Sequence, residues 1–299
     1  MLQFQPPGFG QRQVKTSLGV MVYYAPLSLP WQRVPESGSG SELVFLHNFG
    51  GGASAYEWSK VYPAFAATHR VLAPDLIGWG QSAHPLRDYQ LSDYLITLVE
   101  FIERACHPPV TVLASSFTGA LTIRLAIQRP ELFQALYLVC PAGFKDFGQE
   151  AGRRLPLELI GTPLVDQIIY ALGAANEFAV RNFLQQFLFA KPERISDEMV
   201  AAFLASAQQP GAEYAALAFL KGNLYFDLAL YLPQLSIPTR FFWGTQAQFT
   251  PLALGRRLAQ LNPEAVVGFE AIAGAGVLPH LEVPEIVIGL MNRHLGDRG

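Results

Sequence analysis

The chain has 299 residues, of which 51% are hydrophobic and 15% charged, and its formal net charge is −3. This length allows one large α/β domain with an insertion, or two small domains. The charge balance and the lack of a basic run do not favour nucleic-acid binding. Two cysteines, Cys106 and Cys140, stand in unrelated segments and indicate neither a disulfide framework nor a metal cluster.

The sequence predicts a cytoplasmic protein. Residues 1–8 lack the charged and apolar regions of a signal peptide, and no uninterrupted apolar stretch is long enough to cross a bilayer. The mean hydropathy of +0.22 is nevertheless high for a soluble protein. It predicts either a large core or an apolar surface that faces a lipid, a hydrophobic ligand or a partner, so a membrane-peripheral location stays open.

Strand and helix patterns alternate over most of the chain. Short apolar runs rich in β-branched and aromatic residues predict buried strands at 14–24, 43–46, 70–73, 110–113, 135–140, 239–243 and 265–269. Apolar residues at helical spacing follow at 53–67, 91–106, 117–129, 251–260 and 284–294. The first strand run is expected to form one arm of a hairpin that turns at Leu18–Gly19. This alternation predicts an α/β fold with a mainly parallel sheet and helices on both faces.

The span 141–236 interrupts this alternation. It has no convincing strand, and its helix-like pieces lie around residues 164–172, 177–189, 196–207 and 213–224. We therefore expect a core of residues 1–140 and 237–299, with 141–236 inserted as a helical cap over the carboxyl edge of the sheet, where ligands of such sheets bind. The cap is rich in Phe, Leu, Ala and Tyr, which predicts an apolar cavity below it, although these side chains could instead pack the cap on the core.

A serine marks the turn from the strand at 110–113 to the helix that ends before Pro130. Small residues flank Ser116 in the run Ala114-Ser-Ser-Phe-Thr-Gly119. A strand, a tight turn with a serine at its apex and a helix form the layout of a nucleophile elbow. The usual G-x-S-x-G is relaxed here, so the run alone could also be an ordinary serine-rich turn.

Four further motifs surround this turn in chain order: His47-Asn-Phe-Gly-Gly-Gly52, Ala73-Pro-Asp-Leu-Ile-Gly-Trp-Gly-Gln-Ser82, Trp243-Gly-Thr-Gln-Ala-Gln-Phe-Thr-Pro251 and Gly274-Ala-Gly-Val-Leu-Pro-His-Leu-Glu-Val-Pro-Glu285. They are similar to an H-G-x-G-G/P oxyanion loop, an A-P-D-x-x-G-x-G-x-S turn, a W-G-x-x-D-x-x-x-P acid loop and a G-x-G-H-x-P-H-x-E-x-P-E histidine loop. With these motifs in order, residues 40–295 resemble the α/β-hydrolase superfamily, in particular its lidded single-domain branch. The resemblance implies the fold of that superfamily and a catalytic position for Ser116.

Two of these motifs lack the residue that the resemblance implies for catalysis. Ala247 stands at the acid position and Val277 at the histidine position, while His280 falls on a second, non-catalytic histidine of the motif. A serine hydroxyl needs a base to take its proton and a third group to orient that base. Valine cannot accept a proton, and loss of triad members lowers rates by about 10⁴–10⁶-fold. We therefore expect Ser116 to be close to inert as an acylating residue.

The oxyanion loop is kept. The resemblance implies that the backbone N–H groups of Phe49 and Phe117 form the oxyanion hole, and that His47 supports the loop from beneath. Asn48 replaces the usual glycine. Asparagine tolerates left-handed backbone angles better than most residues, and its side chain could donate a hydrogen bond into the pocket.

Two residues could substitute for the missing pair. His280 could act as the base if its loop were re-threaded, although a loop histidine bonded to backbone is the simpler interpretation. Asp146, shortly after the strand at 135–140, could replace the acid. The sequence contains no metal-binding spacing, no P-loop and no Rossmann fingerprint, so no metal or cofactor is predicted.

Three functions compete. The first is a non-catalytic protein that binds a small hydrophobic ligand under its cap, with little or no hydrolase activity. The second is a serine-dependent ester hydrolase or lyase with a non-standard base, which would act on an ester-like substrate. The third is a membrane-peripheral or partner-binding scaffold. The sequence does not indicate the oligomeric state.

Overall fold

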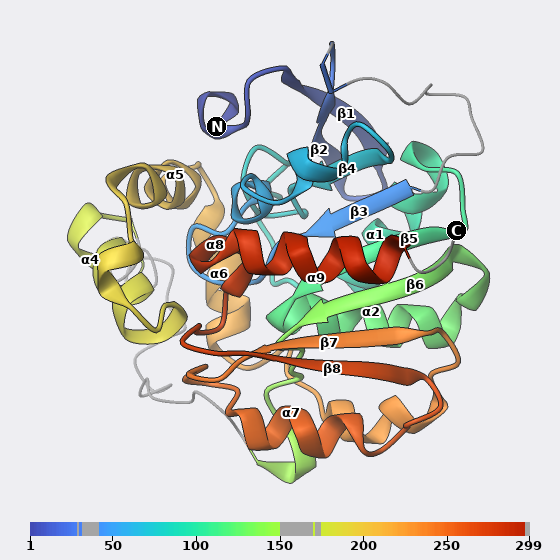
Figure 1. Cartoon of the computed structure of the whole chain (residues 1–299). Helices are drawn as coiled ribbons and strands as arrows, with labels where there is room; N and C mark the ends of the chain where they lie inside the picture. The colour runs from blue at the N-terminus through green and yellow to red at the C-terminus, as the bar shows by residue number, and fades with distance from the viewer. Residues whose placement is uncertain (29, 32–41, 150–169, 171–174, 297–299) are drawn as a thin grey trace.

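The computed structural model describes residues 1–28, 30–31, 42–149, 170 and 175–296. Its centre is an eight-stranded sheet in the order β1-β2-β4-β3-β5-β6-β7-β8 (Figure 1). The strands are β1 (Phe9–Thr16), β2 (Gly19–Pro26), β3 (Glu42–Leu46), β4 (Arg70–Pro74), β5 (Val110–Ser115), β6 (Phe133–Val139), β7 (Thr239–Gly244) and β8 (Val266–Ile272). Pairing is antiparallel from β1 to β2 and from β2 to β4, and parallel between all other neighbours. The predicted mainly parallel sheet is confirmed.

The amino-terminal hairpin is longer than the sequence pattern indicates. Strand β1 begins at Phe9, and the hairpin closes with Thr16 opposite Gly19. Only its two ends are buried, whereas the middle of β1 alternates between exposed and half-buried residues. A strand of this kind has few apolar residues, so its start escapes a search for apolar runs.

Helices cover both faces of the sheet. In Figure 1, α9 (Pro284–Gly296) crosses in front of the central strands, and α2 (Ser116–Gln128) lies behind them. The other core helices are α1 (Leu91–Ala105), α7 (Leu252–Ala259) and the short α8 (Pro279–Glu282). Every residue of β3 and β5 is buried, as expected for parallel strands covered on both faces.

The predicted helix over residues 53–67 is wrong. The segment forms two short 3-10 helices, η2 (Ala55–Trp58) and η3 (Tyr62–Phe65). Pro63 lacks a backbone N–H and cannot continue an α-helix from the preceding turn. Every residue of η2 is buried, so this segment has no solvent-facing side of the kind that an amphipathic helix presents.

The described residues between β6 and β7 form helices and turns, apart from one isolated bridge between Phe144 and Phe226. The helices are α4 (Glu177–Phe183), which continues as a π-helical turn η7 (Leu184–Leu188), then α5 (Asp197–Ala207) and α6 (Ala212–Leu220). The helix-like piece expected around 164–172 falls outside the described residues, apart from Tyr170. We propose to keep the division into a core of 1–140 and 237–299 and a cap of 141–236.

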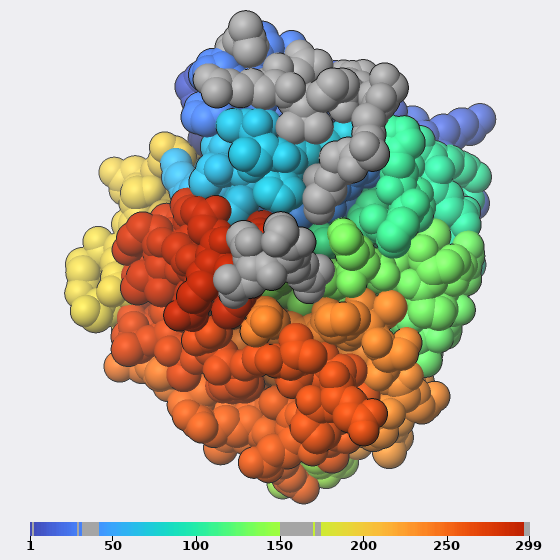
Figure 2. Space-filling view, turned by 45° about the vertical axis from the view of Figure 1, so that its right-hand side comes forward, coloured from blue at the N-terminus to red at the C-terminus, as the bar shows by residue number. Residues whose placement is uncertain are grey.

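The cap segment lies at the carboxyl ends of the parallel strands. The arrows of β3 and β6 in Figure 1 point to the side that carries α4, α5 and α6. Figure 2 shows the cap segment projecting at the edge of the molecule, beside the carboxyl-terminal segment. Among the helices that the structure describes, none combines the length and the apolar character that a membrane span requires.

Candidate functional site

Ser116 sits at the junction of β5 and α2 in a strained backbone conformation. Its φ is +51°, in the left-handed region that residues with a Cβ atom rarely adopt. Such strain persists only where the surroundings enforce it, and it is concentrated at functional sites. The turn is closely packed: a Cβ atom added at Gly119 would lie 3.1 Å from Cβ of Pro141. Ser116 thus has the strained strand-to-helix geometry of a nucleophile elbow, and it lines a cavity.

A cavity of about 350 Å³ lies over Ser116, between the sheet edge and the cap. Eight aromatic residues line it: Phe49, Phe144, Tyr170, Phe183, Phe187, Phe219, Tyr225 and Phe249. Its polar lining in the described chain comes from Asn48, Ser116 and Thr250 besides the two tyrosines, and it includes no Asp, Glu, Lys, Arg or His. This volume and composition suit a small, mainly apolar molecule.

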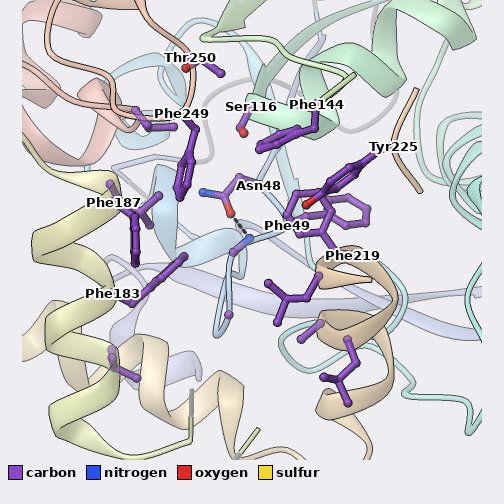
Figure 3. A pocket seen from close by; sticks show the side chains of 18 of the residues that line it. Asn48, Phe49, Ser116, Phe144, Phe183, Phe187, Phe219, Tyr225, Phe249 and Thr250 are labelled. Carbon is purple, nitrogen blue, oxygen red and sulfur yellow. Dashed lines mark hydrogen bonds between the residues drawn. The ribbon is translucent and has the colours of Figure 1, made fainter. Parts of the chain in front are cut away.

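The aromatic side chains stand on two sides of the cavity (Figure 3). On one side the ring of Phe187 stacks on that of Phe249, with centroids 5.1 Å apart. On the other side Phe144 stacks on Tyr225 at 5.2 Å and meets Phe219 edge to face at 5.2 Å. Asn48 and Ser116 lie between the two groups.

The histidine position of the sequence motif opens into this cavity. Val277 lines the cavity together with Ser116 and is 2% exposed to solvent. Its loop is fixed, because the Val277 N–H donates to the carbonyl oxygen of Leu188 at 2.8 Å. Ala247 is buried outside the cavity lining, and its N–H donates to the Gly244 carbonyl oxygen at 3.3 Å. An isopropyl group therefore faces the cavity at the position where the motif predicts an imidazole.

The loop after β3 is supported by His47. The His47 ring donates from Nδ1 to the carbonyl oxygen of Asn48 at 2.7 Å, and the Leu76 N–H donates to Nε2 at 3.0 Å. Because a backbone N–H only donates, Nε2 accepts and Nδ1 carries the proton. Burial lowers the pKa of His47 to about 4, so the ring is neutral at pH 7.

Asn48 is held by both its backbone and its side chain. Its N–H donates to Glu57 Oε2 at 3.1 Å, and its side-chain oxygen Oδ1 accepts from the Gly50 N–H. Asn48 does not use its tolerance of left-handed angles, because its φ is not positive, whereas Gly52 has a φ of +78°. The glycine supplies the conformational freedom that the turn needs.

The rings of Phe49 and Phe117 meet edge to face with centroids 5.0 Å apart, and Phe49 lines the cavity. The N–H of Phe117 belongs to the first turn of α2, where the helix offers no acceptor. An oxyanion hole formed by the two amides remains our prediction.

His280 lies apart from the cavity lining. Its ring is fully buried, stacks on Trp58 with centroids 3.9 Å apart, and places Nε2 3.6 Å from Glu57 Oε2. Burial lowers the pKa of His280 to about 3, and neither ring nitrogen has a hydrogen-bond partner among the described residues. The position does not favour His280 as a substitute base, and it also differs from the backbone-bonded histidine of the simpler interpretation.

Asp146 holds backbone groups. Its carboxylate accepts from the N–H of Gly143 at 3.0 Å and from that of Leu228 at 2.9 Å, which ties the two ends of the cap segment together. Burial raises the pKa of Asp146 to about 6. The residue is not part of the cavity lining, so its position does not favour a catalytic role.

Two buried glutamates escaped the sequence argument. Glu57 accepts from Asn48 N–H and, at 3.4 Å, from Ser115 Oγ. Glu282 accepts from the N–H groups of Ala190 (3.1 Å) and Gly276 (2.7 Å). Glu282 matches a glutamate of the histidine-loop motif, but the motif gives it no partner, and Glu57 shows no signal beyond a carboxylate within an apolar run. No cluster of His, Cys, Asp and Glu suited to a metal ion occurs in the described parts of the chain.

Comparison with known proteins places this fold and site in a family. Residues 43–290 match the alpha/beta hydrolase family, and the chain belongs to it. An uncharacterized hydrolase of Bacillus subtilis, YugF, is 25% identical over 286 residues, which cover 93% of this chain and 94% of the relative. An uncharacterized protein of Mycobacterium tuberculosis is 27% identical over 277 residues, which cover 87% and 76%.

Solved structures agree on the fold. Carboxylesterase CesB of Bacillus subtilis superposes with a TM-score of 0.75 at 17% identity, covering 97% of this chain and 92% of that chain. At this identity the similarity shows the shared architecture alone.

Proposed function

We propose that this chain is an alpha/beta-hydrolase-fold protein that binds a small hydrophobic ligand under its cap and has little or no hydrolase activity. The observation that carries the proposal is Val277, which faces the same cavity as Ser116. In the described part of the chain the cavity lining offers Ser116 neither an imidazole nor a carboxylate. A serine without such a base is a weak nucleophile.

The rest of the cavity is suited to binding. Its aromatic side chains offer large, rigid apolar surfaces that lose little conformational freedom when a ligand binds. Replacing a polar histidine by valine removes a group that would have to be desolvated by an apolar ligand.

Binding can be tested with Nile red, a neutral dye whose fluorescence rises in apolar sites. We expect saturable binding at one site in the wild type. Ala216 lines the cavity from α6, and Ala216→Trp should fill it and abolish binding. Ala201 is exposed on α5, so Ala201→Trp is the matched control and should bind as the wild type does. Equal dye binding by all three proteins would refute a ligand site in this cavity.

The competing candidate is an ester hydrolase or lyase with a non-standard base. The strained elbow at Ser116 favours it, because the serine keeps the backbone geometry of a nucleophile. In that case Ser116→Ala should abolish a measurable activity. An activity that survives Ser116→Ala cannot use the serine as its nucleophile.

A further inference from the structure

Asn48 has its backbone and one end of its side-chain amide engaged. The backbone N–H donates to Glu57 and the carbonyl oxygen accepts from His47. The side-chain oxygen Oδ1 accepts a hydrogen bond from the Gly50 N–H. Because that N–H can only donate, the oxygen must face Gly50 and the nitrogen Nδ2 must face the other way.

The free end of this amide points into the cavity. Figure 3 shows the Asn48 nitrogen directed away from Gly50, toward the side formed by Phe187 and Phe249. The nitrogen carries two N–H donors. A donor held in place before binding loses little entropy when it meets an acceptor, so it discriminates between ligands more sharply than a mobile group does.

The surroundings of this donor are electrically neutral. Charged side chains are absent from the described cavity lining. Asn48 is bonded to the buried Glu57 and His47, and the buried His280 lies 3.6 Å from Glu57. Burial raises the pKa of Glu57 to about 8 and lowers those of the two histidines, so uncharged forms dominate at pH 7. A charged ligand would lose its hydration here without gaining a counter-charge.

We propose that Asn48 is a specificity-determining residue, and that the pocket takes a neutral, mainly apolar ligand with one carbonyl oxygen placed beside Asn48 and Ser116. This inference rests on the proposed binding function and adds the chemical class of the ligand. The two aromatic sides accommodate a flat, apolar body, and the amide nitrogen of Asn48 selects the acceptor oxygen.

The test compares three probes of the same size by displacement of Nile red: 2-acetylnaphthalene, 2-isopropenylnaphthalene and 2-naphthoate. The first two differ in one group, C=O against C=CH2. One net hydrogen bond predicts that the wild type binds the ketone about five- to tenfold more tightly than the hydrocarbon. The anionic naphthoate should bind more weakly than both.

Variants of Asn48 assign the preference. Asn48→Leu keeps the branched shape of the side chain but removes the donor, and Asn48→Ala serves as a second variant. Both should lose the preference for the ketone, which is measured as the ratio of the hydrocarbon and ketone Kd values within one protein. Asn292 is exposed on α9, so Asn292→Ala is the control and should keep the preference.

The outcomes separate the two proposals. If the wild type binds neither the dye nor any probe, the proposed binding function fails, and the inference fails with it. If it binds the hydrocarbon and the ketone equally, or if Asn48→Leu keeps the ketone preference, only the role of Asn48 is overturned. Tighter binding of naphthoate would refute a neutral ligand class.

Discussion

At the scale of single residues, the site combines a strained serine with an apolar cavity lining. Ser116 has a left-handed φ of +51°, and Val277 lines the same cavity. Glu57 accepts hydrogen bonds from the loop after β3 and from the elbow, with no exposure to solvent. Each of these two residues predicts a measurable effect on stability.

The strain at Ser116 should be visible when the residue is replaced. Glycine adopts a positive φ without steric cost, whereas alanine does not. We expect the free energy of unfolding of Ser116→Gly to exceed that of Ser116→Ala by about 1 kcal/mol. Urea denaturation of both variants measures the difference. Equal or lower stability of the glycine variant would show that the elbow is not strained.

Glu57 should make the stability depend on pH. Burial raises its pKa from 4.5 to about 8, so between these values the folded chain keeps a proton that the unfolded chain has released. The associated stability is complete below pH 4.5 and is lost as the pH rises through 8. Glu57→Gln keeps the shape without the charge. We expect the free energy of unfolding of this variant to exceed that of the wild type at pH 9 by on the order of 3 kcal/mol, and by less at pH 6.

Urea denaturation at pH 6, 7, 8 and 9 tests this dependence. His47 and His280 take up protons in the unfolded chain as the pH falls toward 6, which lowers the stability of the wild type and of Glu57→Gln alike and leaves the difference between them unchanged. If the difference in unfolding free energy between Glu57→Gln and the wild type does not grow from pH 6 to pH 8, the pKa of Glu57 is not raised.

At the scale of elements, Glu282 joins the cap to the core. From α8 its carboxylate accepts from the N–H groups of Ala190 and Lys191 after η7, each at 3.1 Å, and from Gly276 at 2.7 Å. It also forms an ion pair with Arg194 at 2.8 Å. One buried side chain thus fixes the loop that carries Val277 against the cap segment.

Removing this carboxylate should loosen the cavity as well as the fold. Glu282→Ala leaves buried N–H groups and Arg194 without their acceptor, which should cost about 3–5 kcal/mol of unfolding free energy. Nile red binding should weaken in parallel, because the loop of Val277 forms part of the cavity. Glu264 is exposed, and Glu264→Ala should change neither quantity. If Glu282→Ala is less stable but binds Nile red as the wild type does, Glu282 does not hold the cavity in shape.

At the scale of the whole molecule, the strand pattern and the motif order predict most of the core, because buried parallel strands are continuous apolar runs. Ser116 and Val277 line one cavity, because both follow parallel strands whose carboxyl ends lie at one edge of the sheet. The segment 53–67 was mistaken for one helix, because its apolar spacing reflects burial on all sides. The orientation of Asn48 depends on a backbone N–H two residues away, which no residue pattern reveals.

The most direct test of the central claim is the hydrolysis of p-nitrophenyl butyrate by the wild type and Ser116→Ala. The claim is that a binding pocket has kept its serine without a base. It predicts that the ester is hydrolysed at the same rate with either protein, close to the rate without protein. The double variant Ala247→Asp/Val277→His restores the residues of the motif. If it hydrolyses the ester and loses this activity when Ser116→Ala is added, Ser116 can still act as a nucleophile. A wild-type kcat/KM that falls tenfold or more in Ser116→Ala would contradict the claim and establish the chain as a serine hydrolase.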